Sequence, residues 1–271
     1  MIAEVTTMLV DSHCHLDFPD FADELEAVVA RAKSAGIARM VTISTRVAQH
    51  ARVLAIAERF PDVFCSVGTH PHNAQEELEV TAADLVARTK HPKVVAIGEA
   101  GLDYHYDHSP RPAQEQGFRR HIAAARETGL PLVIHTREAD ADTANILAEE
   151  TKAGPFPAVL HCFTGGRDLA FKGIELGLYV SFTGILTFKK SDDLRAIAKA
   201  LPADRILVET DSPYLAPGRY RGKRCEPAYV VETAKVLAEV RGATEEEIAR
   251  QTTENFFRLF SKVSRPTAAA A

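Results

Sequence analysis

The sequence lacks several features that would assign it to particular protein classes. No run of eighteen consecutive apolar residues occurs among its 271 residues, so we expect no membrane span. There is no excess of positive charge, because 32 basic residues face 37 acidic ones, which excludes a chain-wide basic field for gripping nucleic acid. Its N-terminal stretch MIAEVTTMLV has no basic leader, and the cysteines show neither C-x-x-C pairing nor the spacing of a small disulfide-bonded domain. We therefore expect a cytoplasmic protein whose cysteines stay reduced: Cys14, Cys65, Cys162 and Cys225.

What the sequence contains is a repeated alternation of short apolar runs and amphipathic stretches. The runs are rich in β-branched residues and are flanked by Gly, Pro or charged residues, which predicts buried strands. The amphipathic stretch 23–36, closed by Gly36, is typical of the helices predicted between them. Successive strands are about 28 residues apart, close to the ~30 residues of a strand–helix–strand unit. The predicted strands are 8–13, 39–44, 63–68, 94–99, 131–136, 158–163, 178–183 and 205–210.

Eight such units predict an α/β fold of the (β/α)8 TIM-barrel type. The competing architecture, a doubly wound open sheet, would need a glycine-rich phosphate-binding turn after the first strand. That position carries DSHCHLD instead. We expect a single barrel domain over 8–260, preceded by an N-terminal extension (1–7) and followed by a flexible tail (261–271).

Two histidines near the first strand are the first chemical signal. His13 and His15 are two residues apart, so on a strand both point to the same side, while Cys14 points away as a packed thiol. Each of two neighbouring buried imidazoles needs a polar partner, and a metal ion supplies one for both.

Four more polar residues end the predicted strands. Glu99 ends the fourth, His135 the fifth and His161 the sixth, and Asp211 follows the eighth. In a barrel these ends meet on one face, where active sites occur. Six ligands are too many for one tetrahedral zinc with an open position, but they suit two divalent ions, Zn, Mg or Mn, that share a carboxylate.

Strand parity also predicts residues that support the ligands from below. Asp11 lies two residues before His13, and Glu209 lies two before Asp211, so both carboxylates point inward beneath a ligand. There they could accept the second N–H of an imidazole, or form a salt bridge with a neighbouring strand.

Taken together, these motifs resemble the TatD family of metal-dependent deoxyribonucleases, over residues 9 to 260. The family implies an amidohydrolase-like barrel with two metal ions: His13, His15, Glu99 and Asp211 would hold one, and Glu99, His135 and His161 the other. Cys225 replaces the usual Asn of RGKRNEP, and His105 stands where an aromatic residue is common; neither touches the metal set. The motifs are DSHCHLD (11–17), GTHPH (68–72), GEAGLDYH (98–105), PLVIHTREA (131–139), LHCFTG (160–165), ETDSPYLAP (209–217) and RGKRCEPAYV (221–230).

Substrate contacts are predicted around the same face. His70 in GTHPH could donate to a phosphate oxygen or to the leaving group. Arg137 follows the fifth strand, and Arg221 and Arg224 lie in the loop after the eighth, a region where barrels often bind phosphate. Among the tyrosines, Tyr104, Tyr106 and Tyr220 could stack on a terminal base or pack within their loops.

The function predicted from these residues and from the resemblance is exonucleolytic hydrolysis of phosphodiester bonds in DNA. A hydroxide held by two metal ions would attack phosphorus, with Glu99 and Asp211 as catalytic residues and Asp211 taking the proton. DNA would be the substrate, without an obligate protein partner or a membrane. Two alternatives stay open, a metal-dependent amide or carboxylic-ester hydrolase on the same barrel and a non-catalytic binding protein.

Overall fold

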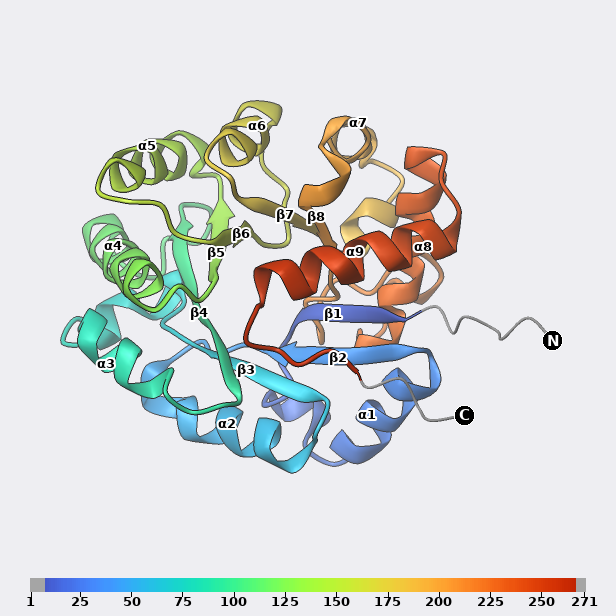
Figure 1. Cartoon of the computed structure of the whole chain (residues 1–271), viewed down its shortest axis with the longest axis horizontal. Helices are drawn as coiled ribbons and strands as arrows, with labels where there is room; N and C mark the ends of the chain where they lie inside the picture. Colours follow the sequence, from blue (N-terminus) through green and yellow to red (C-terminus); the bar gives the residue numbers. More distant parts are fainter. Residues whose placement is uncertain (1–7, 267–271) are drawn as a thin grey trace.

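The computed structural model describes residues 8–266, and these form the predicted barrel of parallel strands (Figure 1). Each strand pairs with the next one in the chain, and a bridge between Cys14 and Ser212 connects the last strand's loop to the first strand. The strands are β1 (Leu9–Cys14), β2 (Ile37–Thr42), β3 (Val63–Val67), β4 (Val94–Asp103), β5 (Leu132–Arg137), β6 (Ala158–Leu160), β7 (Tyr179–Phe182) and β8 (Ile206–Val208).

Helices surround the barrel because each strand is followed by an amphipathic segment (Figure 1). The apolar sides of these helices and the outward faces of the strands form one continuous core, and nearly every strand residue is buried. The helices are α1 (Leu25–Ser34), α2 (His50–Arg59), α3 (Ala82–Arg88), α4 (Arg111–Thr128), α5 (Asp140–Lys152), α6 (Arg167–Glu175), α7 (Asp192–Ala200), α8 (Val230–Arg241) and α9 (Glu245–Leu259).

The inside of the barrel is closed at the N-terminal ends of its strands. Inward-facing residues such as Val10, Val41 and Val95 form a second apolar cluster with Phe256 and Phe260, in and just after α9. Helix α9 lies across this end of the barrel in Figure 1. Apolar side chains therefore fill the lower barrel, and polar side chains can gather only at the opposite, carboxyl end.

Three strand boundaries differ from the prediction in a way that affects the site, and one of them is the end of β6 at Leu160, which leaves His161 just beyond the strand. Strand β4 continues to Asp103, four residues beyond the predicted end at Glu99, with a break in register between Gly98 and Ala100. Strand β8 ends at Val208, so Asp211 lies three residues beyond it. Glu99 is thus held inside a paired strand, whereas Asp211 is held by a loop.

The packed part of the chain extends beyond residue 260. Lys262 Nζ donates to three backbone carbonyls at the end of α3 and the start of β4, and Val263 is buried. The expected extension 1–7 and the end of the expected tail, 267–271, lie outside the described residues. None of the helices within 8–266 is both long enough and apolar enough to cross a membrane.

Candidate metal centre

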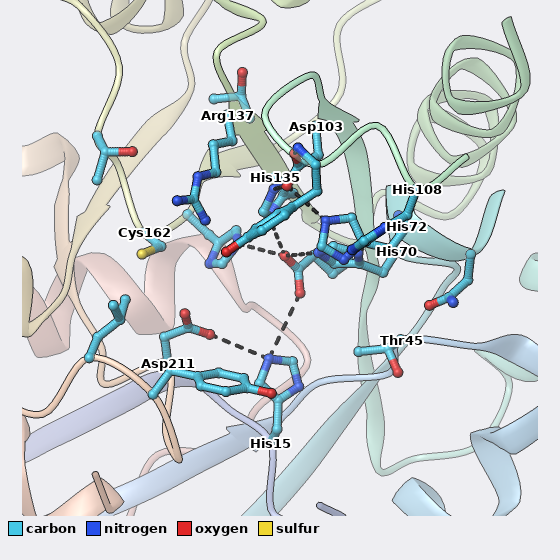
Figure 2. Close-up of a pocket in the computed structure, with 18 of the residues that line it drawn as sticks. His15, Thr45, His70, His72, Asp103, His108, His135, Arg137, Cys162 and Asp211 are labelled. Atoms are coloured by element: carbon cyan, nitrogen blue, oxygen red, sulfur yellow. Dashed lines mark hydrogen bonds and ion pairs between the residues drawn. The ribbon is translucent and has the colours of Figure 1, made fainter. Parts of the chain in front are cut away.

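The predicted ligands meet in a pocket of about 1060 Å³ at the carboxyl ends of the strands (Figure 2). Five of them line the pocket, and the sixth, His13, is fully buried beneath it. The five are His15, Glu99, His135, His161 and Asp211. The convergence predicted from the strand ends is therefore present.

His13 and His15 face the same point, as their spacing predicts. Their Nε2 atoms are 3.2 Å apart, and Asp211 Oδ1 lies 3.5 Å from His13 Nε2 and 3.3 Å from His15 Nε2. Cys14 between them points away and donates to the carbonyl of Val41. Three potential ligand atoms thus surround one position on the β1–β8 side of the pocket.

Glu99 lies at the centre of the cluster. Its side chain is 2% exposed, and its two oxygens face imidazoles from four different strands or their loops. The distances are 2.7 Å to His161 Nε2, 2.9 Å to His135 Nδ1, and 3.4 Å each to His13 Nε2 and His70 Nε2. A carboxylate so placed can contribute to two metal positions at once.

The neighbouring imidazoles keep the two buried carboxylates, Glu99 and Asp211, ionised. Burial alone would raise the pKa of Glu99, but the neighbouring histidines, His161 above all, hold it well below its usual value. Asp211 follows the same pattern: burial opposes ionisation, and hydrogen bonding with His15 lowers the pKa. Conversely, burial would lower the pKa of His161, but Glu99 and Glu209 raise it well above the usual value. The two carboxylates are thus in the ionised form that a metal ligand needs.

The structure fits divalent ions at this place. Its described residues provide three groups whose ligand atoms lie within 4.8 Å of one another: His13, Glu99 and His161; His13, His15 and Asp211; and His70, Glu99 and His135. Nitrogen and carboxylate donors of this kind suit Zn, Mn and similar ions. His161 Nε2 is buried and lies 2.7 Å from Glu99. Within the described residues it has no hydrogen-bond partner of good geometry, so this nitrogen is a candidate metal ligand.

The two carboxylates predicted beneath the ligands behave differently. Glu209 accepts from His161 Nδ1 at 3.2 Å and from the backbone N–H of Cys162 at 2.6 Å, so it orients an imidazole as predicted. Asp11 instead accepts from the backbone and hydroxyl of Thr210 and from the backbone N–H of His13. Asp11 is directed to Thr210, so within the described residues it does not make the expected bond to an imidazole. Burial raises the pKa of Asp11 to about 8.

Three non-glycine residues that line the pocket have left-handed backbone conformations, Cys162, Asp211 and Leu215, and the first two lie beside or among the predicted ligands. Asp211 has φ 57° and Cys162 has φ 44°, and neither is a glycine. Such conformations cost about 1–3 kcal/mol and persist where the surroundings fix them. Here they turn the chain at the ends of β8 and β6, so that Asp211 and Cys162 both line the pocket.

Sequence reasoning missed Asp103, which extends the cluster. Its Oδ2 lies 3.0 Å from His135 Nε2 and 2.8 Å from His72 Nε2 (Figure 2). Burial opposes its ionisation, but these two histidines hold the pKa of Asp103 far below its usual value. Strand parity could have found it, because Asp103 is four residues from Glu99 in what proves to be one strand.

His70 is placed with its Nε2 facing Glu99. Its Nδ1 accepts the backbone N–H of His72, so in the neutral ring the proton sits on Nε2. Burial lowers the pKa of His70 to about 4, which keeps the ring neutral. His70 is thus a hydrogen-bond donor at the pocket wall.

The three predicted arginines are not brought together. Arg137 lines the pocket, with its guanidinium 4.8 Å from the centre of the Tyr106 ring and directed toward the cluster in Figure 2. Arg221 lies over Phe188, and Arg224 pairs with Glu24 and donates to the carbonyl of Asp20. Neither of these two is among the residues that line the pocket.

Of the three predicted tyrosines and the two residues that depart from the family pattern, only Tyr106 lines the pocket. Tyr104 bonds Asp142, and Tyr220 stacks on Tyr229 at 3.8 Å. His105 pairs with Glu138 at the surface. Cys225 is buried within the loop after β8, and its backbone N–H donates to the carbonyl of Pro213. Neither departure reaches the metal-holding groups.

Comparison with known proteins identifies the family. A family model described as TatD related DNase matches residues 10–261. The chain is 41% identical to the "Uncharacterized metal-dependent hydrolase YabD" of Bacillus subtilis (93% of this chain, 99% of the relative). It is 36% identical to the "3'-5' ssDNA/RNA exonuclease TatD" of Edwardsiella piscicida (93% and 99%). The crystal structure of YJJV, a TatD homologue from Escherichia coli, superposes with a TM-score of 0.88 at 29% identity (94% and 99%). The chain therefore belongs to the TatD-related DNase family of metal-dependent hydrolases.

Proposed function

We propose that this protein hydrolyses phosphodiester bonds at the end of a single-stranded nucleic acid, DNA above all. The observation that carries the proposal is the position of Glu99, a buried carboxylate shared by two metal-holding groups on the floor of an open pocket. A second observation concerns the rim: within residues 8–266, no carboxylate lies within ion-pair distance of Arg137, so its guanidinium is free for a phosphate.

In this proposal, two divalent ions occupy the centre. His13, His15, Glu99 and Asp211 would hold one, and Glu99, His135 and His161 would hold the other. When bound, such ions make hydroxide available at neutral pH and neutralise the charge that develops on the phosphate.

The chain's own residues then have separate roles. Asp211 is the proton acceptor, because its side chain is 16% exposed against 2% for Glu99 and only Oδ1 is engaged with the histidines. Glu99, being buried, holds its position between the two sites. Glu209 fixes the ring of His161 through Nδ1. His70 lines the pocket with its Nε2 atom 3.4 Å from Glu99, and its Nε2–H would donate to a phosphate or leaving-group oxygen bound beside that carboxylate.

Exonucleolytic action on single strands agrees with the name of the Edwardsiella piscicida relative. The pocket, of about 1060 Å³, has room for a nucleotide with its phosphate, and within residues 8–266 its rim offers Arg137 without a carboxylate partner rather than a long basic track. Cytoplasmic location and the absence of an obligate protein partner stay predictions from the sequence.

The direct test is hydrolysis of end-labelled single-stranded DNA and RNA by enzyme that is chelated or supplied with Zn, Mn or Mg. We expect cleavage only with metal, and a large loss of kcat in Asp211→Asn with metal content retained. Near-native turnover of Asp211→Asn would exclude Asp211 as the proton acceptor. Cleavage of carboxylic esters or amides, with none of either strand, would replace the proposal by the amide or ester hydrolase.

A further inference from the structure

The pocket lining divides into a polar half and an apolar half. The loops after β2 to β4 and the end of β5 provide mainly charged and hydrogen-bonding side chains outside the ligand set, among them Arg46, His72, Asn73, Glu76, His108 and Arg137. The ring of Tyr106 on this side lies under the guanidinium of Arg137 and stacks on His108. Loops after β1, β7 and β8 provide the aliphatic side chains and two aromatic rings, Phe18, Ile185, Tyr214 and Leu215. These three strands are neighbours in the barrel, so the four apolar residues lie together on one side of the metal centre.

An exposed ring is the outermost part of this apolar half. Tyr214 is 55% exposed, the highest value among the large hydrophobic side chains of residues 8–266. Phe18 supports it from the inside, edge to face at 6.0 Å, and Phe18 in turn stacks on the ligand His15 at 4.6 Å. A continuous series of rings thus leads from the metal centre to an open aromatic face.

We propose that Phe18, Ile185, Tyr214 and Leu215 form a nucleobase subsite, in which Tyr214 stacks on the base next to the scissile phosphate. This inference rests on the proposed function, since it concerns how the same pocket holds a nucleic-acid end. A nucleotide has the same two-sided character as the pocket, a flat apolar base and an anionic phosphate. With the phosphate at the metal centre and the adjoining chain toward Arg137, the base falls on the apolar half.

Such a subsite accepts every base, because each has a π-face, and it favours single strands, whose terminal bases are free to leave their neighbours. Stacking on an aromatic side chain contributes about 1–3 kcal/mol per base, which corresponds to roughly fivefold to 150-fold in kcat/KM. The tyrosine hydroxyl is not required for this contact.

The test compares Tyr214→Ala and Tyr214→Phe on two labelled oligonucleotides, one intact and one with abasic residues as the last two nucleotides at the degraded end. We expect Tyr214→Ala to lose about tenfold or more in kcat/KM on the intact strand, and Tyr214→Phe to stay within about threefold of wild type. On the abasic strand, wild type and Tyr214→Ala should be equally slow. Tyr220→Ala is the matched control and should match wild type on both strands, because Tyr220 packs on Tyr229 away from the pocket.

Two outcomes overturn the subsite: an unchanged kcat/KM of Tyr214→Ala on the intact strand, or equal losses on the intact and abasic strands. Binding of both oligonucleotides by fluorescence anisotropy, with chelator present, separates the subsite from the proposed function. If no strand is hydrolysed but Tyr214→Ala weakens binding of the intact strand alone, the proposed function fails and the subsite stands. If hydrolysis is normal and binding does not depend on the base, the subsite fails and the proposed function stands.

Discussion

The two buried carboxylates beneath the metal centre provide a matched pair of conservative changes, Glu209→Gln and Asp11→Asn. Both replace a buried carboxyl group by an amide of the same size, and the pKa of Asp11, raised by burial to about 8, leaves that carboxyl largely neutral at pH 7. Glu209 Oε1 accepts from the Nδ1 of His161, whereas Asp11 contacts Thr210 and a backbone N–H but no imidazole. In Asp11→Asn, the Thr210 hydroxyl can turn and accept from the new amide, so every partner is kept. We therefore expect Glu209→Gln alone to weaken metal binding.

The expected size follows from the hydrogen bond that changes. A bond to a charged group contributes about 1.5–3 kcal/mol and a neutral one about 0.5–1.5 kcal/mol, so loss of the charge removes about 1–1.5 kcal/mol from the support of His161. That corresponds to about a tenfold rise in the metal dissociation constant, at the lower end of the 10–100-fold typical of residues that support metal ligands. Asp11→Asn should stay within about threefold of wild type.

Titration of each apo-protein with Zn against a competing chelator measures this difference, and thermal unfolding shows that both variants are folded. Equal metal affinities of the two variants, or an unchanged affinity of Glu209→Gln, would refute the inference that Glu209 acts through His161.

Two further comparisons follow from the structure. Gly101→Ala places a methyl group, at φ 147°, against a backbone carbonyl oxygen of β5, and should cost about 3 kcal/mol or more of unfolding free energy. Gly117→Ala, inside α4, places its methyl group in ordinary van der Waals contact with Ala74 and should be neutral or stabilising by up to about 1 kcal/mol. Urea unfolding that ranks the two variants in the opposite order would contradict the packing described. Arg137→Ala should lower the slope of log KM against log salt concentration for single-stranded DNA by about 0.7. The side chain of Arg224 is paired with Glu24, so Arg224→Ala should leave that slope unchanged. Equal slopes for the two variants would show that Arg137 does not contact the substrate phosphates.

Much of the site could be predicted from strand periodicity. His13 and His15 share a side of the barrel because side chains alternate along a strand, and His135 and His161 reach the same pocket because parallel strands end on one face. These rules depend only on local geometry and topology, which the alternation of apolar runs already specifies.

Other features depend on contacts that the sequence does not encode locally. The true length of β4 is set by its pairing with β5 past the irregularity at Gly98, and this pairing makes Asp103 an inward-facing residue. Regular alternation predicts an inward-facing Asp11, but its neighbour Val10 faces the barrel interior, and Asp11 instead accepts from Thr210, 199 residues away in the chain. Arg224 carries the right charge, yet the loop after β8 turns it toward Glu24, while the exposed ring of Tyr214 had no periodic signal to mark it.

The central claim is that Glu99 joins two metal positions into one centre, and the metal content of Glu99→Gln tests it most directly. Elemental analysis of metal-loaded protein should give about two ions per chain for wild type and for Glu138→Gln, a surface control paired with His105. Glu99→Gln should lose both ions, because each metal-holding position of the proposal uses this carboxylate. Retention of two ions per chain by folded Glu99→Gln would contradict the account.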